Sequence, residues 1–311
     1  MNNYLGIDTS NYTTSVAVYN DNKKIIHSKK LLPVKQGQLG LRQSDAVFHH
    51  VQQLPDVMNN VINRLDALPT AIGVSKAPRD IQGSYMPCFT VGISSARILS
   101  SVLNIPCYMF SHQTGHIVAA LYSANRLDLL NERFLAFHVS GGTTEAVIVE
   151  PDKDSIIRTN LVAKTLDLNA GQAIDRVGNM MGIDFPAGPK IDELALQYNG
   201  KGIKVNPAIK GYDCCLSGVE NICQKMKVQG SSDIDVSRYC IEYILKSLDI
   251  MCERILNDYG KMAILFAGGV MSNSIINREL SSKYNALFAK PEFSSDNAAG
   301  IAILTSIKSE R

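Results

Sequence analysis

Two histidines of the sequence have the spacing of a metal site. His112 and His116 lie four residues apart in the segment HQTGH. Because side chains at positions i and i+4 lie on the same face of a helix, both imidazoles could bind one metal ion. A zinc protease of the HExxH type carries its general base directly after the first histidine, where this sequence has Gln113. The pattern therefore favours a metal site without proteolysis, and its alternative is two exposed histidines at a helix start.

Two further residues could complete the ligand set. His138 lies near the end of the apolar segment FLAFHV, just before a turn of small residues, and Asp296 lies in SSDNAAG before the last predicted helix. A carboxylate in that position could bind a metal or could simply cap the helix N-terminus. We therefore take His112, His116, His138 and Asp296 as candidate ligands.

A turn of small residues occurs twice, at matching places in the two halves of the chain. Residues 5–19, LGIDTSNYTTSVAVY, align without a gap with residues 135–149, LAFHVSGGTTEAVIV, after a shift of 130 positions. Each segment is typical of a strand–turn–strand hairpin in which backbone N–H groups can face an anion such as a phosphate. Two such hairpins predict a duplicated, two-lobed fold with a nucleotide between the lobes. The candidate nucleotide-binding residues of these turns are Asp8, Ser10, Ser140, Gly141, Gly142, Thr143 and Thr144.

Three more segments contribute candidate nucleotide contacts, each with a structural alternative. Gly268 and Gly269 follow a short apolar run, where they could bring the backbone against a base or ribose, or form a tight turn. Asn273 could hydrogen-bond the nucleotide or cap the next helix. Asp175 could bind a ribose hydroxyl or be a helical surface charge, and Gly188 in PAGP could approach the ribose or make a turn.

The periodicity of apolar residues predicts an α/β fold with mixed sheets flanked by helices. We expect a first lobe at residues 1–110 plus 297–311 and a second lobe at 111–296, with the last helix packed back on the first lobe. Residues 200–217 are expected to be irregular. The predicted helices lie at 45–65, 93–103, 112–122, 169–181, 191–198, 218–227, 236–259, from about 272, and 297–308. Besides the two hairpins, strands are predicted at 24–32, 71–75, 106–109, 156–163 and 262–266.

The composition is typical of a folded protein of the cytoplasm. Hydrophobic residues make up 45% and charged residues 19% of the 311 residues. The net charge of +2 predicts no global attraction to nucleic acid, although lysine clusters leave a local RNA-binding patch open. Seven cysteines without a CxxC pair indicate reduced thiols. Neither a leader-like start nor an apolar run of membrane length is present, so we expect a cytoplasmic protein without membrane contact.

In this order and together, the motifs resemble the family of TsaD, the catalytic subunit of tRNA threonylcarbamoyladenosine synthesis, formerly called the glycoprotease or O-sialoglycoprotein endopeptidase family. The resemblance covers nearly the whole chain and implies the actin-like ATPase (ASKHA) fold. Its motifs are GIDTS at 6–10, HxxGH at 112–116, SGGxT at 140–144, AGxAxD at 170–175, PxGP at 186–189, LSG at 216–218, AGGVxxN at 267–273 and DN at 296–297.

The resemblance implies a reaction and a set of ligands. One divalent metal ion, iron or zinc, would be held by His112, His116 and Asp296, with His138 as an additional ligand. The nucleotide, ATP or an acyl-adenylate, would contact the SGGTT turn, Asp175, Gly188 and Asn273. The reaction would pass a threonylcarbamoyl group from the adenylate to an adenosine of tRNA, with the metal polarising the carbonyl. The family also implies a paralogous partner subunit or a homodimer formed through helices of the first lobe.

The sequence departs from the family pattern beside several motifs. These departures remove charged or protonatable groups, and this favours an alternative in which the chain is a catalytically altered ATP-binding scaffold or a regulatory paralogue. The old label of metalloprotease fits less well, since no general base stands beside the histidines. The changed positions are Tyr12 and Thr13 after GIDTS, Thr114 in place of the glutamate of HxEGH, Thr143 in place of the histidine of SGGHT, Gln172 in AGEAxD, and residues 77–80, APRD, in APGxxxG.

Overall fold

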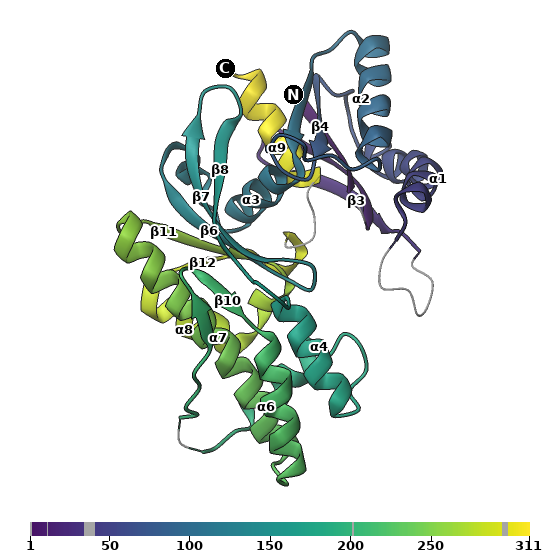
Figure 1. Cartoon of the computed structure of the whole chain (residues 1–311). Helices are drawn as coiled ribbons and strands as arrows, with labels where there is room; N and C mark the ends of the chain where they lie inside the picture. Colours follow the sequence, from purple (N-terminus) through teal and green to yellow (C-terminus); the bar gives the residue numbers. More distant parts are fainter. Residues whose placement is uncertain (1, 11, 34–40, 201, 294–297) are drawn as a thin grey trace. The chain divides into compact units, whose positions relative to one another are not determined.

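A computed structural model describes residues 2–10, 12–33, 41–200, 202–293 and 298–311. The chain divides into two compact units of mixed α/β structure, shown in Figure 1. The first comprises residues 1–130, 151–158 and 292–311, and the second comprises residues 131–150 and 159–291. Asp296 and Asn297, which the sequence assigned to the metal site and to the start of the last helix, lie outside the described residues.

The first unit is built on a five-stranded sheet in the order β3-β2-β1-β4-β5. β1, β2 and β3 form an antiparallel meander, and β4 and β5 continue the sheet parallel to β1. The strands are β1 (Asn3–Ser10), β2 (Thr13–Asn20), β3 (Ile25–Leu31), β4 (Ala71–Ala77) and β5 (Cys107–Ser111); the helices are α1 (Gln43–Ile62), α2 (Phe89–Leu103), α3 (His112–Ser123) and α9 (Ala298–Ser309), with short 3-10 turns at Leu127–Asn131 and Pro291–Phe293.

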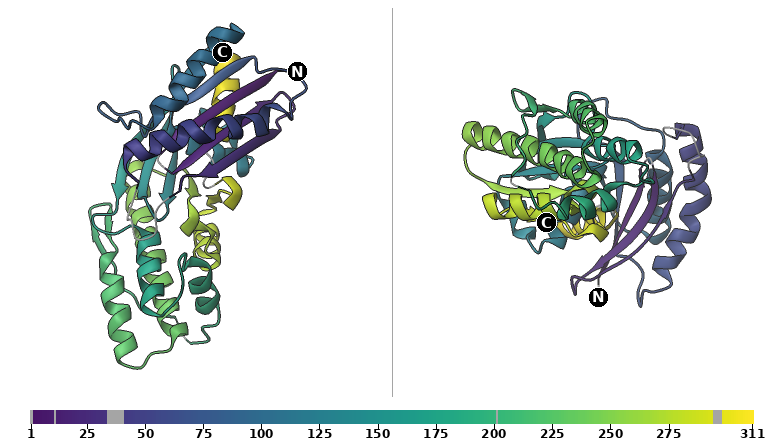
Figure 2. Two further views of the ribbon diagram at one scale, coloured as in Figure 1. Left: turned by 90° about the vertical axis from the view of Figure 1, so that its right-hand side faces the viewer. Right: turned by 90° about the horizontal axis from the view of Figure 1, so that it is seen from below.

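Alternate residues of β1 decide which helices cover each face of this sheet, because successive side chains of a strand point to opposite faces. Leu5 and Ile7 join the core formed with α1 and α2. Gly6 lies against α9 instead, and a Cβ added at Gly6 would come within 2.3 Å of the carbonyl oxygen of Ala298. Figure 2 shows α1 lying across the purple strands of this sheet. As expected from the sequence, the last helix therefore packs on the first unit.

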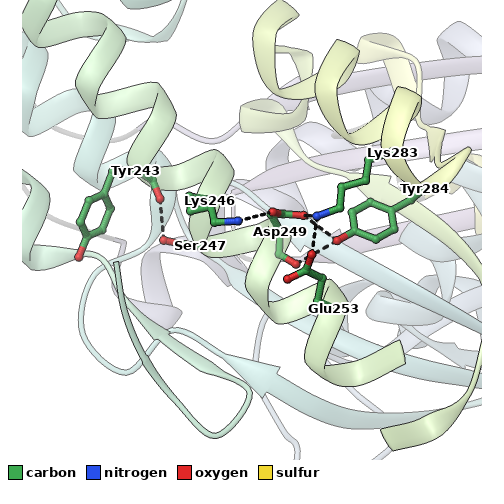
Figure 3. A network of polar contacts seen from close by, with 7 residues as sticks. All are labelled: Tyr243, Lys246, Ser247, Asp249, Glu253, Lys283 and Tyr284. Atoms are coloured by element: carbon green, nitrogen blue, oxygen red, sulfur yellow. Dashed lines mark hydrogen bonds and ion pairs between the residues drawn. The ribbon is translucent and has the colours of Figure 1, made fainter. Parts of the chain in front are cut away.

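The second unit repeats the plan around a five-stranded sheet in the order β12-β11-β6-β7-β8. Buried apolar side chains of the sheet and of the helices form one large core, and α7 and α8 are joined by the charged network of Figure 3. The strands are β6 (Phe134–Val139), β7 (Thr144–Asp152), β8 (Ile156–Lys164), β11 (Ala263–Ala267) and β12 (Leu287–Phe288), with a separate hairpin of β9 (Ala208–Lys210) and β10 (Asp213–Cys215). The end of β7 and the start of β8, within residues 151–158, are counted with the first unit. The helices are α4 (Ala170–Met180), α5 (Gly188–Leu196), α6 (Ser217–Val228), α7 (Asp233–Tyr259) and α8 (Ser274–Tyr284), with a 3-10 turn at Gly269–Ser272.

The strand register confirms the internal duplication that the sequence predicted. Gly6 pairs with Ala17 in the first hairpin, and Ala136 pairs with Val147 in the second, so a shift of 130 positions carries one pair onto the other. In each sheet the central strand also has a parallel neighbour on its other side, β4 beside β1 and β11 beside β6. The ungapped alignment of the two segments thus reflects equal backbone pairing, and not only similar composition.

Several elements differ from the expectation. α3 packs with α9 in the first unit, although we expected it to open the second lobe. The reason is close backbone packing, since a Cβ on Gly300 would come within 1.8 Å of the Gly115 carbonyl oxygen. α5 begins at Gly188 because Pro189 suits the first turn of a helix. The segment expected to be irregular contains the short β9–β10 hairpin. Within the described part of the chain, no helix is long and apolar enough to cross a membrane.

Candidate functional site

A cavity of about 540 Å³ lies within the second unit. Its volume is in the range of small-molecule and cofactor pockets. Four segments form its wall: the turn after β6, the helix α4, the start of α5 and the turn after β11. Five residues that the sequence proposed as nucleotide contacts line it, Gly141, Asp175, Gly188, Gly269 and Asn273. The other lining residues are Gly171, Ile174, Phe185, Pro186, Pro189, Asp192, Val270 and Ser272.

The glycines around the cavity fall into two groups. Gly141, Gly188 and Gly269 line the cavity, and a Cβ added to any of them would meet no protein atom within 4 Å. A Cβ on Gly171 would instead come within 2.6 Å of the Gly141 nitrogen, and Gly268 has a φ of +103°, which side chains rarely adopt. Protein packing thus requires Gly171 and Gly268. The other three leave open space that a bound molecule can use.

The SGG turn is fixed by the hydroxyl of Ser140. Its Oγ accepts the backbone N–H of Gly142 at 3.3 Å and of Thr143 at 3.1 Å, and the Ser140 N–H donates to the Thr143 carbonyl at 2.7 Å. Thr144 lies at the start of β7, where its Oγ1 accepts the N–H of Ala170 at the start of α4. The turn is therefore held in shape by its own side chains, and Gly141 is the part of it that lines the cavity.

Two carboxylates face the cavity from neighbouring helices. Asp175 of α4 accepts the N–H of Ala187 through Oδ1 at 2.9 Å, which holds the PAGP segment beside α4. Asp192 of α5 accepts the Asn273 side-chain amide at 2.8 Å and the Ser274 N–H at 3.1 Å. Asn273 also caps α8 by accepting the Ile276 N–H at 3.0 Å, the structural role weighed for it from the sequence. The two carboxylates therefore order the rim as well as supplying acceptors for a ligand.

Asp192 is a cavity residue that the sequence interpretation missed. It lies four residues after Gly188 on α5, so the helical spacing brings both residues to the same side of the cavity. That i, i+4 relation to the PAGP motif was the available signal. Phe185, just before the same motif, lines the cavity while 83% exposed, which gives the wall an aromatic surface open to a planar ligand.

The first unit holds the predicted histidine pair. His112 and His116 open α3 with ring centroids 4.7 Å apart. Nδ1 of His112 lies 2.8 Å from Oδ2 of the fully buried Asp8, whose other oxygen accepts the Ser10 N–H at 2.8 Å. Burial alone would raise the pKa of Asp8, but the charge of His112 and the hydrogen bonds from His112 and Ser10 hold that pKa below its ordinary value. Since a carboxylate only accepts, His112 donates through Nδ1.

The structure describes three of the four candidate metal ligands. His112 and His116 are neighbours in the first unit, and His138 lies in the second, on β6 between its partners Glu145 and Ala267. Asp296 is outside the described residues. Within the described ranges, no three histidine, cysteine, aspartate or glutamate side chains gather as a metal site. The metal set therefore remains a prediction, with its histidine pair brought together by α3.

Buried thiols do not contribute an active nucleophile. All seven cysteines are free. Burial raises the pKa of Cys88 to about 11, and that of Cys214 and Cys223 to about 12. At neutral pH these thiols stay protonated, whereas nucleophilic attack and metal binding need the thiolate.

Solved structures share the fold of this chain at low sequence identity. Component A of (R)-2-hydroxyglutaryl-CoA dehydratase from Acidaminococcus fermentans matches with 14% identity and a TM-score of 0.59 over 100% of both chains. HypF from T. kodakarensis matches with 11% identity and a TM-score of 0.60, over 99% of this chain and 48% of its own. A ROK family glucokinase from Streptomyces griseus, solved with glucose and AMPPNP, matches with 11% identity and a TM-score of 0.53 over 98% of both chains.

These likenesses and the duplicated sheets define a two-lobed protein of the actin-like ATPase fold. The model of the TsaD family, tRNA N6-adenosine threonylcarbamoyltransferase, matches residues 23–303. The chain belongs to this family.

Proposed function

We propose that this protein transfers a threonylcarbamoyl group from an adenylate to an adenosine of tRNA, and that the adenylate binds in the cavity of the second unit. The observation that carries the proposal is the gathering of Gly141, Asp175, Gly188, Gly269 and Asn273 around one cavity. These residues come from four separate segments of the sequence. Family membership supports the proposed reaction, and the cavity supports the proposed position of its nucleotide.

The chemistry of the cavity wall suits an adenosine moiety. Asp192 and Asp175 are acceptors for ribose hydroxyls, and hydrogen bonds to charged acceptors are among the stronger ones in proteins. Phe185 and Ile174 offer apolar surface to a base. The open space at Gly141 and Gly269 lets a phosphate approach the backbone closely.

We further propose that one divalent metal ion, iron or zinc, binds His112 and His116 together with Asp296, with His138 as an additional ligand. Asp8 supports this proposal, because a histidine ligand commonly donates its other ring N–H to a carboxylate, which orients the ring and makes it more basic. His112 would then bind the metal through Nε2. When bound, such an ion would polarise the carbamoyl carbonyl. This arrangement gives Asp8 a role in orienting His112 in addition to its candidacy as a nucleotide contact.

A partner subunit of similar fold, or a second copy of the chain, is proposed at the helices of the first unit. Two of these helices carry exposed apolar side chains, Phe48 and Val51 on α1 and Ile98 and Val102 on α2. Light scattering of the wild type and of a Val102→Glu variant would test this, alone and with the candidate partner. The proposal would be contradicted if wild type and variant both had the mass of a single chain, alone and in the presence of the candidate partner.

The alternative function is a nucleotide-binding scaffold without transfer activity, which the neutral residues at Thr114, Thr143 and Gln172 favour. A single-turnover assay separates the two functions. The purified protein, loaded with iron or zinc, is given pre-formed threonylcarbamoyl-adenylate and unmodified tRNA, with and without the partner proteins of its host. Threonylcarbamoyladenosine in the tRNA digest supports transfer. Tight adenylate binding without product supports the scaffold. If the protein gives no product and does not bind the adenylate, both functions are rejected.

A further inference from the structure

Helix α3, which carries the histidine pair, begins with an incomplete cap. Ser111 is the N-cap, and its Oγ accepts the N–H of Thr114, the third residue of the helix, at 3.2 Å. In a complete capping box, a glutamate or glutamine in that third position would accept a bond from the N-cap backbone. The first turn of α3 contains no acidic residue. The positive end of the helix dipole therefore lacks a carboxylate from the helix itself.

A carboxylate reaches this turn from elsewhere in the first unit. Oδ2 of Asp80 lies 3.3 Å from the Thr114 hydroxyl, and Thr114 Oγ1 lies 2.7 Å from Ser111 Oγ. The protons can be assigned, since an ionised carboxylate only accepts. Ser111 donates to Thr114, and Thr114 donates to Asp80. Each hydroxyl proton is used once, and Ser111 still accepts the Thr114 N–H.

Two more contacts hold Asp80 in this position. Its Oδ1 forms an ion pair with Lys76 at 3.0 Å. The carbonyl of Pro78 accepts the N–H of Gln113, the second residue of α3, at 3.0 Å. The segment after β4 therefore contacts the first turn of α3 through both its backbone and its carboxylate. Thr114 is 2% exposed, so its hydrogen bonds compete little with water.

We propose that Asp80 is a positioning residue for the His112/His116 pair, and that its carboxylate replaces the acidic third residue which α3 lacks. The inference rests on the proposed function for its link to catalysis. Asp80 acts through Thr114 and the first turn of α3, a helix in which His112 is the first residue and His116 the fifth. Asp80 lies in the segment APRD and Thr114 in HQTGH, two places where the sequence departs from the family pattern. The structure joins these two departures in one hydrogen bond.

The test is a rescue experiment with two readouts. Asp80→Ala and Thr114→Val each remove one partner of the hydrogen bond between Thr114 and Asp80. The double variant Asp80→Ala/Thr114→Glu puts a glutamate in the third position of α3, where it can complete a capping box with Ser111. We expect each single variant to lower the transfer rate about tenfold, because small displacements of a catalytic group are costly. The rescue variant should recover most of the rate. Asp66→Ala, which removes an exposed aspartate of the same unit, should leave the rate unchanged.

The second readout does not depend on activity. In protein labelled with ¹⁵N-histidine, the six histidines give few enough imidazole signals to follow His112 and His116 individually in the metal-free state. Both single variants should shift these two signals, and the rescue variant should move them back. Unshifted signals in Asp80→Ala would overturn the proposal, as would a folded rescue variant whose signals stay displaced. If the wild type transfers nothing, the proposed function fails while the imidazole signals still decide the role of Asp80.

Discussion

Asn273 donates its side-chain amide to Asp192 over 2.8 Å and so joins the start of α8 to α5 at the rim of the second-unit cavity. The same carboxylate accepts the backbone N–H and the hydroxyl of Ser274. These bonds fix the distance between two segments that are about eighty residues apart in the sequence. A cavity rim held in this way is preorganised for a ligand, which reduces the entropy lost on binding.

Replacing Asp192 with Asn should weaken adenosine nucleotide binding about tenfold. The substitution removes a charged acceptor and leaves Ser274 with a weaker partner, and hydrogen bonds to charged groups contribute about 1.5–3 kcal/mol. Isothermal titration with AMP measures the effect. Glu193→Gln is the matched control, since Glu193 is the adjacent residue on α5 and pairs with Lys190. Equal losses of AMP affinity in both variants would show that Asp192 has no specific role in nucleotide binding.

The two groups of glycines should respond oppositely to alanine. Gly188→Ala and Gly269→Ala place a methyl group in open space, so we expect a melting temperature within about 2 °C of wild type and loss of nucleotide binding. Gly171→Ala forces a contact with Gly141 and should lower the stability by about 1–3 kcal/mol. Thermal unfolding of the three variants with and without AMP measures both their stability and their nucleotide binding. Normal binding by Gly188→Ala and Gly269→Ala would show that the ligand lies elsewhere.

Replacing both His112 and His116 with Ala should abolish binding of iron or zinc while the protein stays folded. His138→Ala should weaken binding only partially, because the other ligands remain. Metal content by mass spectrometry after dialysis gives the stoichiometry, and His49→Ala on α1 is the control. Retention of one metal per chain by the double variant would sink the ligand assignment. If His138→Ala binds metal as the wild type does, His138 is only a strand residue.

Because of the network in Figure 3, we expect the free energy of unfolding to fall as the pH is lowered into the acid range. Asp249 accepts bonds from Lys246 at 2.7 Å, Lys283 at 2.5 Å and Tyr284 at 2.6 Å. Burial alone would raise its pKa, but these hydrogen bonds outweigh burial and hold the pKa of Asp249 below the ordinary value of 3.8. A carboxyl whose folded pKa is depressed stabilises the protein above its unfolded pKa, and this stabilisation is lost as the pH falls through the folded pKa.

Urea unfolding between pH 7 and pH 3 measures this dependence. Asp249→Asn should lower the free energy of unfolding at pH 7 by about 1–3 kcal/mol, since three donors lose a charged acceptor. The difference between variant and wild type should begin to shrink as the pH falls below about 4, because the Asp249 carboxyl then binds a proton in the unfolded chain more readily than in the folded protein. A constant difference across the range would mean that the charge of Asp249 contributes nothing. Asp66→Asn, which neutralises an exposed aspartate outside the network, controls for a general loss of negative charge.

Much of the fold could be predicted from the sequence because it rests on local patterns. The apolar alternation in residues 5–19 and 135–149 fixes two hairpins, and their ungapped match predicted the equal register seen at Gly6–Ala17 and Ala136–Val147. The helical spacing of apolar residues predicted α1 and α7 within a few residues of their ends. Glycine and proline motifs predicted where the backbone turns, at SGG, PAGP and AGG.

The sequence by itself therefore determined the duplicated sheets, the family and the residue types of the site. Only the tertiary structure decided which of those residues lie together, at the cavity of the second unit or at the contacts between distant segments. It brought Asp192 to Asn273 across about eighty positions, placed α3 against α9 through Gly115 and Gly300, and set Asp80 against Thr114. The physical reason is that hydrogen bonds and close backbone approaches between distant segments depend on how whole elements pack, whereas periodicity and turn chemistry report only on neighbours along the chain.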